Sequence, residues 1–301
     1  MTQQKTMQIL PAVLAEECFI VFGERLNDTS FSQFEQYAGR SFKVLESWQI
    51  AQNQIKLLHA PWQAGYLEFA HSLQLDAAPL TFQAKLSQSG LLVMDMDSTI
   101  IQMECIDEIA KLAGTGDQVS QITASAMRGE LDFEQSLRQR VATLQDAPER
   151  ILQQVREYLP LMPGLKPMIA ALQKYGWKIA IASGGFTYFA DYLQQQLGLD
   201  YAVSNQFEIC NGKLTGKVQG DIVHAQYKAD TLLRLAAQWH IPLQNTVAIG
   251  DGANDLPMIH TADLGVAFHA KPKVQQQAKV VVNYANLTGL LCLLSARDRF
   301  N

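Results

Sequence analysis

The pattern of hydrophobic and polar positions changes near residue 90. Before that point the chain predicts, in order, strand 16–23, helix 29–38, strand 42–49, strand 53–59, helix 62–74 and strand 79–85. This βαββαβ order is typical of a ferredoxin-like α+β domain, a small sheet with two helices on one face. We therefore predict a first domain over residues 1–85, joined to the rest by the polar stretch 83–90.

From residue 91 onward, short continuous apolar runs recur, most of them separated by helical stretches. They predict strands at 91–95, 178–183, 201–205, 246–251, 264–268 and 279–283. Apolar strands that alternate with helices indicate a parallel sheet covered on both faces. The fold class predicted for residues 86–301 is α/β, a doubly wound parallel sheet with a Rossmann-type core.

Two segments interrupt this alternation. A long, mostly helical stretch at about 104–160 follows the first predicted strand, and an excursion of that length is expected to form a small domain of its own. Residues 206–222 alternate in polarity and contain Asn211-Gly212, which predicts a β-hairpin.

Composition narrows the functional classes. The chain has 301 residues, 48% of them hydrophobic, and a formal charge of −5, with no basic run that would favour nucleic acid or an anionic membrane. Four widely spaced cysteines without a CxxC pair are interpreted as buried apolar side chains in a reducing compartment. No apolar stretch is long enough to span a bilayer, so we expect a cytoplasmic protein.

Polar side chains follow three of the predicted parallel strands directly. They are Asp95 and Asp97, then Ser183-Gly184-Gly185, and finally Asp251, Asn254 and Asp255. Because ligands of open α/β sheets bind outside the carboxyl ends of the strands, we expect these groups to face one crevice. Four carboxylates can share a crevice if a divalent cation neutralises them.

The chemistry of these groups indicates Mg²⁺ and a phosphate. Hard oxygen ligands without His or Cys favour Mg²⁺, which keeps coordination positions for water and a substrate phosphate. Ser183 and the glycines after it offer a hydroxyl and approachable N–H groups, and Lys228 at the start of a predicted helix can complete the cradle. Taken singly, each motif also fits a turn, a helix cap or a surface charge. Their joint occurrence after successive strands favours the site.

These motifs resemble those of a known superfamily. "DMDST", "SGG", the later lysine and "GDGAND" resemble the four motifs of the haloacid dehalogenase phosphotransferases. "ECIDEIAKLAG", "AMRGELDFEQSLRQRV" and "ASGGFTYFADYL" are similar to segments of the phosphoserine phosphatases, including their helical cap. The resemblance covers about residues 91–290 and implies a cap at about 104–160. Residues 1–85 loosely resemble an ACT-type regulatory domain.

The resemblance implies roles for the core residues. Asp95 would be the nucleophile that forms an acyl phosphate, and Asp97 the general acid and base. Lys228, Ser183, Gly184 and Asn254 would hold the phosphate. One Mg²⁺ per active site would be bound by Asp95, the Asp97 carbonyl and Asp251, with Asp255 orienting a metal-bound water.

The same resemblance assigns the substrate pocket to the cap. Glu104 would bind an ammonium group, Arg140 a carboxylate, and Met127 and Phe133 would form apolar walls. From spacing alone, Glu104 could simply begin a helix and Arg140 could pair with a surface glutamate. Because the cap must open and close, its connections near 98–103 and 160–167 are predicted hinges.

The function implied is Mg²⁺-dependent hydrolysis of O-phospho-L-serine, the last step of serine synthesis. Two alternatives stay open. One is a phosphatase or phosphotransferase for another small phosphate ester such as phosphohomoserine, and the other is an amino-acid sensor with an inactive core. Beyond the small-molecule substrate, the ACT-like domain suggests two further partners, an amino-acid effector and a second copy of the chain, and neither nucleic acid nor membrane is expected.

Overall fold

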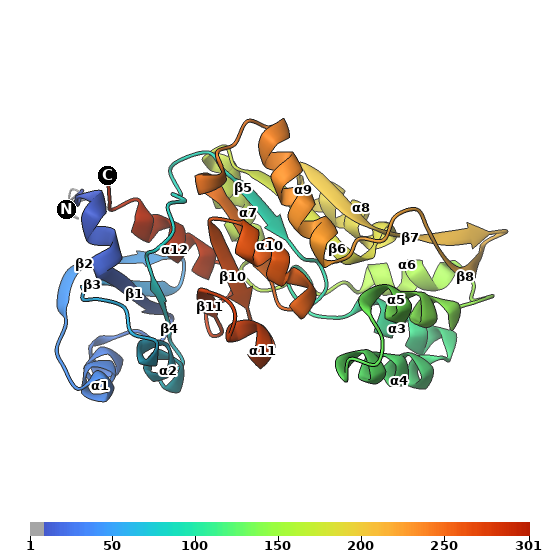
Figure 1. The fold of residues 1–301 in the computed structure, drawn as a ribbon, viewed down its shortest axis with the longest axis horizontal. Coiled ribbons are helices and arrows are strands. Elements are labelled where there is room, and N and C mark those ends of the chain that lie inside the picture. The colour runs from blue at the N-terminus through green and yellow to red at the C-terminus, as the bar shows by residue number, and fades with distance from the viewer. Residues whose placement is uncertain (1–8) are drawn as a thin grey trace.

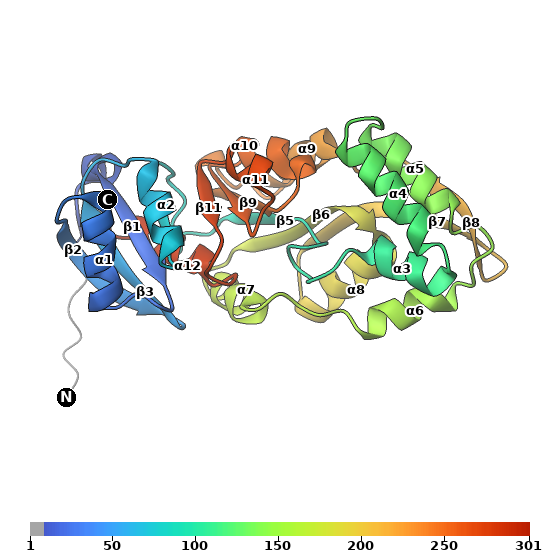
Figure 2. The same ribbon diagram turned by 90° about the horizontal axis from the view of Figure 1, so that it is seen from below.

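The computed structural model describes residues 9–301, which form a four-stranded sheet, a seven-stranded sheet and a helical insert (Figure 1). In both Figure 1 and Figure 2 the seven-stranded sheet lies between the other two parts. This arrangement confirms the predicted fold class: an α/β unit with a helical insert after its first strand, and a separate N-terminal α+β unit.

The N-terminal unit is antiparallel, with the sheet order β2-β3-β1-β4 expected of a ferredoxin-like fold. Its elements are a 3-10 helix (Ala12–Glu17), β1 (Cys18–Gly23), α1 (Asp28–Ala38), β2 (Lys43–Ile50), β3 (Asn53–His59), α2 (Gly65–Ser72) and β4 (Asp76–Pro79). Every residue of β1 is buried, because one face of the sheet packs under α1 and α2 and the other faces the rest of the protein.

The predicted strand 79–85 is wrong. The strand that pairs with β1 is β4, which ends at Pro79, where the missing N–H group cannot continue the ladder. Residues 82, 84 and 86 are buried alternately, and this imitates a strand pattern. The segment is instead fixed by single contacts: Asp263 accepts hydrogen bonds from the N–H groups of Gln83 and Ala84, and the Leu86 carbonyl accepts one from Trp177.

The larger sheet has the order β11-β10-β9-β5-β6-β7-β8 and is parallel except for β8. Its strands are β5 (Leu91–Met94), β6 (Lys178–Phe186), β7 (Tyr201–Cys210), β8 (Lys213–Gln219), β9 (Thr246–Gly250), β10 (Leu264–Phe268) and β11 (Val280–Val282). The predicted strand 201–205 and the first arm of the predicted hairpin are one continuous strand, β7, which pairs with β6 first and with β8 further on.

Helices cover both faces of this sheet (Figure 2). They are α7 (Leu165–Lys174), α8 (Thr187–Leu197), α9 (Ala225–Gln238), α10 (Leu256–Thr261), α11 (Pro272–Gln275) and α12 (Gly289–Arg297), with short 3-10 helices at Leu243–Asn245 and Ala253–Asp255. Alternate residues of β5 point to opposite layers: Leu91 and Val93 pack under α9 and α10, whereas Leu92 and Met94 face α7 and α8. Burial on both faces explains the continuous apolar runs of the sequence.

The insert between β5 and β6 contains four helices: α3 (Cys105–Ala113), α4 (Gly116–Met127), α5 (Phe133–Ala142) and α6 (Arg150–Glu157). The two segments that connect it to the core lie side by side. Gln102 N–H donates to the Pro160 carbonyl at 2.9 Å, and Met162 N–H donates to the Ile100 carbonyl at 2.8 Å. The two predicted hinge segments are therefore adjacent.

The C-terminal helix α12 packs on the N-terminal sheet, contacting β1 and β3. Trp48 donates to Ser295 and Asn53 donates to Thr288, both from strands of that sheet. The buried Asp76 carboxylate accepts hydrogen bonds from the N–H groups of residues 283–285, directly after β11. A division at residue 85 therefore separates two folds that share a buried interface.

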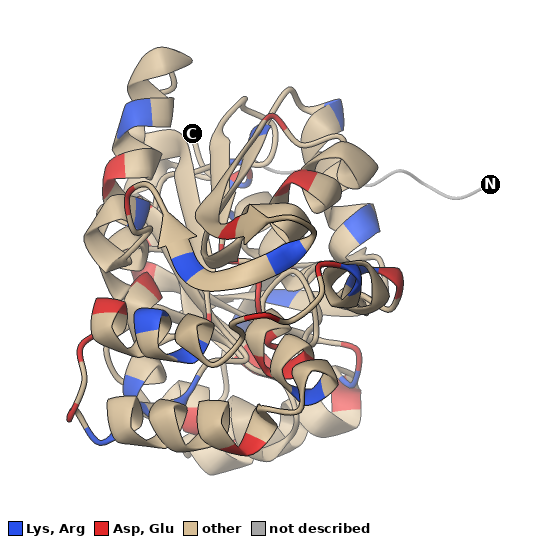
Figure 3. Cartoon of the chain, turned by 90° about the vertical axis from the view of Figure 1, so that its right-hand side faces the viewer, with Lys and Arg blue, Asp and Glu red and all other residues tan. Residues whose placement is uncertain are grey.

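The surface of the described residues includes one exposed cysteine and a mixed distribution of charged residues. All four cysteines are free, but Cys210 is exposed, so the interpretation of every cysteine as buried is wrong at the end of β7, where the hairpin turns in solvent. Viewed from the insert, acidic and basic residues are interspersed along the ribbon (Figure 3). Among residues 9–301, no helix combines the length and apolar character needed to cross a membrane.

Candidate active site

The strand ends that carry the predicted site residues are neighbours in the sheet. Met94, the last residue of β5, pairs with Ile181 of β6 on one side and Ile249 of β9 on the other. All three strands are parallel, so the loops after their carboxyl ends leave the sheet at one edge. This arrangement brings together the polar residues that follow each strand.

Lys228 links two of these loops. It lies on the buried face of α9 with an exposed fraction of 0%, and its Nζ is 3.0 Å from Asp95 Oδ1 and 2.7 Å from Asp255 Oδ1. Burial alone would lower the pKa of this ammonium group, but Asp255 and Asp95 outweigh that effect and raise it. The surface-charge interpretation of Lys228 is therefore wrong, because a fully buried cation needs paired anions.

Asp95 is held through one of its oxygens. Its Oδ1 accepts a hydrogen bond of 2.7 Å from the Met96 N–H in addition to the contact with Lys228. No donor within residues 9–301 contacts Oδ2. The side chain is thus fixed in orientation with one carboxylate oxygen free to react.

Three buried carboxylates form a candidate cation site. Asp95, Asp251 and Asp255 each offer one oxygen, and these oxygens lie within 4.8 Å of one another. Burial, followed by repulsion from neighbouring carboxylates, raises the pKa of Asp251 to about 7. Burial and Asp95 raise that of Asp255 to about 6, against the opposing effect of Lys228. An all-oxygen set of this kind fits a hard divalent cation, whose charge would favour the ionised carboxylates and so oppose these shifts.

Asp97 lies beside this group rather than in it. Burial, followed by the Glu104 and Asp95 carboxylates, raises its pKa well above the usual range for a carboxyl group. Its Oδ1 accepts a weak hydrogen bond of 3.4 Å from the N–H of Cys105, the first residue of α3. The side chain is therefore a candidate for holding a proton near neutral pH.

The Ser183-Gly184-Gly185 segment turns closely past the first motif. Gly185 N–H donates to Ser183 Oγ at 3.0 Å, and a Cβ atom at Gly185 would lie 3.0 Å from Asp97 Oδ2 and 2.6 Å from Met96 Cε. The segment can approach Asp97 this closely only because it has no side chain there. Asn254, on the third loop, folds its side chain over Gly252, and within residues 9–301 no hydrogen bond joins it to the other site residues.

The insert contributes Glu104, Phe133 and Arg140. Glu104 accepts a hydrogen bond of 2.8 Å from Ser98, and Phe133 packs on Gly184, whose Cβ position would lie 2.8 Å from the ring. The Arg140 guanidinium interacts electrostatically with Glu104, Asp107 and Asp97, while burial lowers its pKa. Within residues 9–301 it forms no ion pair, so neither Glu134 nor Glu149 is its partner.

Met127 lies apart from this group. The residue is 76% exposed at the end of α4, and in the part of the chain that the structure describes no contact places it against Glu104, Phe133 or Arg140. The predicted role of Met127 as a pocket wall thus gains no support from this arrangement, whereas Phe133 lies directly over the Ser183 segment.

Three residues of the site had no role in the sequence interpretation. Thr99, fully buried, donates to Asp251 Oδ1 at 3.2 Å, and Ser98 orients Glu104 from a left-handed backbone conformation, φ 57°. Cys105 is hydrogen-bonded to Asp97. The polar pair Ser98-Thr99 directly after the acidic motif was the available signal, but their partners lie on other loops.

Two family descriptions match the chain. Residues 92–260 match the haloacid dehalogenase-like hydrolase family, and residues 17–79 match a family described as a domain of unknown function (DUF5609). The first match contains the strand ends that carry Asp95, Ser183 and Asp251 and the helix that carries Lys228, and the second spans β1 to β4.

Individual proteins match over greater lengths. A phosphoserine phosphatase of Haemophilus influenzae is 61% identical over 303 residues, which cover 98% of this chain and 96% of that protein. The crystal structure of a probable phosphoserine phosphatase from Vibrio cholerae, in unliganded form, has a TM-score of 0.87 at 52% identity and covers 96% of this chain and 88% of its own. A phospho-aspartyl intermediate analogue of phosphoserine phosphatase has a TM-score of 0.64 at 39% identity, covering 68% of this chain and 98% of its own.

Proposed function

Because the chain belongs to the haloacid dehalogenase-like hydrolases, and within them to the phosphoserine phosphatases, we propose that it hydrolyses O-phospho-L-serine to L-serine and phosphate through a phospho-aspartyl intermediate. One observation carries the proposal. Asp97, whose pKa is raised, interacts electrostatically with Asp95 on the core side and with Glu104 and Arg140 on the insert side. A proposed nucleophile, a proposed proton donor and two proposed substrate-binding charges are therefore neighbours in the structure.

Asp95 is the proposed nucleophile. Two donors hold Oδ1, so Oδ2 forms the bond to phosphorus while the bond from phosphorus to the serine oxygen breaks. Lys228 compensates negative charge on the carboxylate, and Ser183 with the N–H groups beside it offers donors to the phosphoryl oxygens.

Asp97 is the proposed general acid and base. Its raised pKa allows it to hold a proton, which it gives to the departing serine oxygen. In the second half-reaction it accepts a proton from water as that water attacks the phosphorus of the aspartyl phosphate. The Asp95 carboxylate and inorganic phosphate are then released, and Asp97 is protonated again.

The carboxylate group at Asp95, Asp251 and Asp255 fits Mg²⁺, with the Asp97 backbone carbonyl as a further proposed ligand. The bound cation would supply positive charge next to the phosphoryl group and make the crowding of these carboxylates favourable. Thr99 holds Asp251 in position through its hydroxyl group.

Substrate choice is proposed to depend on Glu104 and Arg140. The ammonium group of phosphoserine would pair with Glu104, which Ser98 orients, and its carboxylate with the planar fork of Arg140. Apart from a weak contact of 3.4 Å from Nε to the Ser136 carbonyl, the guanidinium donors have no hydrogen-bond partner within residues 9–301. Phe133 would cover the phosphate-binding turn.

Phosphate release from a panel of phosphate esters tests this function. With Mg²⁺, O-phospho-L-serine should be hydrolysed with the highest kcat/KM, ahead of phosphohomoserine, phosphothreonine and phosphoethanolamine. A higher kcat/KM for phosphohomoserine would favour the first alternative. Absence of hydrolysis of every ester would favour a sensor with an inactive core.

Replacing Arg140 with Gln should raise the KM for phosphoserine by about ten- to a hundredfold, since a charge-assisted bidentate contact is lost. The kcat/KM for phosphoethanolamine, which has no carboxylate, should change by less than about threefold. Arg138→Gln is the matched control, because Arg138 lies on the same helix but pairs with Glu134 at the surface. Equal losses for both substrates would show that Arg140 does not recognise the carboxylate.

The stabilisation given by Mg²⁺ should increase with pH. In the metal-free protein, Asp251 and Asp255 have raised pKa values of about 7 and about 6, so the stability that their protonated forms contribute is lost as pH rises towards 7. Mg²⁺ requires the ionised forms and should therefore raise Tm more at about pH 8 than at about pH 5.5. Thermal unfolding with and without Mg²⁺ measures this. Asp251→Asn should remove most of the shift, and a shift in the wild type that is independent of pH would contradict the assignment.

Two parts of the proposal concern the protein as a whole. A cytoplasmic location is part of the proposal, because four free cysteines suit a reducing compartment. An amino-acid effector at the N-terminal domain and a homodimer remain predictions from the ACT-like resemblance.

A further inference from the structure

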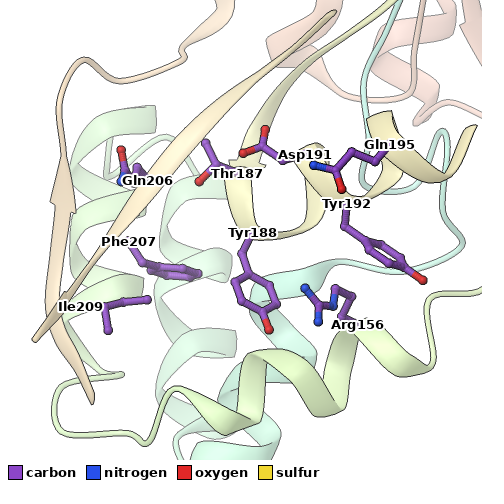
Figure 4. A pocket seen from close by; sticks show the side chains of 9 residues that line it. All are labelled: Arg156, Thr187, Tyr188, Asp191, Tyr192, Gln195, Gln206, Phe207 and Ile209. Carbon is purple, nitrogen blue, oxygen red and sulfur yellow. The ribbon is translucent and has the colours of Figure 1, made fainter. Parts of the chain in front are cut away.

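A pocket of about 310 Å³, separate from the candidate active site, lies between the insert and the core (Figure 4). Its walls come from α6 of the insert, from α8 and from β7, and they include none of the residues assigned to the active site. Arg156 faces Tyr188 and Tyr192 across the pocket, with Phe207 and Ile209 on the β7 side.

Arg156 has its donors available. Its guanidinium carbon lies 4.7 Å from the ring centre of Tyr188 and 5.0 Å from that of Tyr192, so both rings are within the distance of a cation–π interaction. Within residues 9–301 no carboxylate pairs with it and no carbonyl accepts a hydrogen bond from it. A cation–π interaction needs no hydrogen bond from the guanidinium, so its N–H groups can donate to a planar anion such as a carboxylate.

Asp191 supplies the opposite charge in the same pocket. It lies on α8 between Tyr188 and Tyr192, and within residues 9–301 it has neither an ion-pair nor a hydrogen-bond partner. Asp191 is an exposed residue, and the partial burial of its carboxyl group raises the pKa of that group. Although Asp191 and Arg156 line one pocket, they do not pair with each other. A ligand that carries both charges, separated in space, could satisfy both.

The β7 side of the pocket carries an apolar surface, whereas Thr187, Gln195 and Gln206 add polar groups to the rest of the lining. Phe207 is buried and stacks on Phe186 with ring centres 3.6 Å apart, and Ile209 continues this surface along β7. Together with the two tyrosine rings they favour an apolar or aromatic group over a small polar one.

We propose that this pocket binds a free α-amino acid with an apolar or aromatic side chain, its carboxylate on the edge of Arg156 and its ammonium group on Asp191. The site differs from the substrate pocket at Glu104 and Arg140, and its existence does not depend on the proposed reaction.

Binding of a ligand in this pocket is expected to depend on the position of the insert relative to the core. Since Arg156 belongs to α6 and Asp191 to α8, a ligand held by both fixes the insert against the core and therefore binds one arrangement of the two better than others. Helix α8 begins at Thr187, directly after the segment that starts at Ser183. The ligand is thus expected to change the kinetics of the active site without entering it.

Calorimetric titration tests the proposal. L-phenylalanine, L-leucine and L-serine are each titrated into the full-length protein in the presence of Mg²⁺. L-phenylalanine or L-leucine should bind more tightly than L-serine. N-acetyl-L-phenylalanine and L-phenylalaninamide each lack one charge and should bind at least about tenfold more weakly than L-phenylalanine.

Variants locate the binding. Asp191→Asn and Arg156→Gln should each weaken it at least about tenfold, whereas Asp230→Asn and Arg150→Gln, the same changes at exposed positions outside the pocket, should not. Arg140→Gln should leave it intact. Unchanged thermal unfolding of the Asp191 and Arg156 variants establishes that they fold. No binding of either apolar amino acid, binding that survives both pocket variants, or binding lost with Arg140→Gln would each overturn the proposal.

Discussion

Asp95→Asn is expected to reduce phosphate release from O-phospho-L-serine by at least about a thousandfold, because a neutral amide oxygen is a much weaker nucleophile than a carboxylate and forms no stable acyl phosphate. The loss should appear in kcat, since Asp95 acts on the phosphorus and the insert supplies most substrate contacts. Single-turnover measurements with radiolabelled phosphoserine should also detect phosphate bound to the wild-type protein and none on the variant.

The expected effect on folding is small and makes the experiment interpretable. Asp95 is one of several crowded carboxylates, so removing its charge relieves repulsion on Asp251 and Asp255 while Lys228 keeps its contact with Asp255. Tm in the absence of Mg²⁺ should therefore stay close to that of the wild type. Asp230→Asn, an exposed aspartate on α9, is the matched control and should retain full activity. A variant that is folded and still active would mean that Asp95 is not the nucleophile.

Lys228→Met is expected to affect both stability and activity. The side chain is fully buried, and its loss leaves Asp95 and Asp255 in the interior without a counter-ion. Breaking a buried ion pair from one side costs about 3–5 kcal/mol in the free energy of unfolding, and the phosphoryl group would also lose a cationic neighbour. Urea unfolding in the absence of Mg²⁺ at about pH 7 measures the first effect, and phosphate release the second.

The pH dependence separates this cause from simple loss of packing. In the variant the two buried carboxylates have lost their cationic partner, so protonation removes the unpaired charge and the stability deficit should shrink as pH falls. Mg²⁺ should also reduce it. Lys178→Met provides the comparison: Lys178 pairs with Asp200 at 2.6 Å but is 45% exposed, and its replacement should cost less than about 1 kcal/mol. A deficit for Lys228→Met that is equally large at low pH would point to packing.

Short-range patterns were sufficient for most of the fold. The apolar runs predicted the strands of the larger sheet because burial on both faces leaves a continuous signal, and the Asn211-Gly212 turn marked the hairpin. The shift of β4 to Asp76–Pro79 escaped prediction because the alternately buried residues after it imitate a strand. The tertiary structure decides which segment is the strand, because Asp76–Pro79 is the one that pairs with β1.

The residues of the candidate site likewise fall into two groups: those that a local motif predicted and those whose role depends on how distant segments pack. Asp95, Ser183, Lys228 and Asp251 were identified because each belongs to a motif at a strand or helix end. The contacts of Thr99 with Asp251 and of Ser98 with Glu104 could not be predicted, since they depend on how separate loops approach one another. Met127 matched the motif of the insert but lies at the surface, because its position depends on the placement of α4 rather than on its neighbours in sequence.

By itself, the sequence determined the two fold classes, the order of the strands along the chain and the residue types delivered to the sheet edge, because periodicity and strand-end motifs are local properties. Tertiary structure alone decided that α12 covers the N-terminal sheet, that Lys228 is buried between two carboxylates, and that Arg156 and Asp191 share a pocket. Each of these contacts joins residues distant in the chain. Their distances and burial, and hence their charge states, are set by packing that no local pattern encodes.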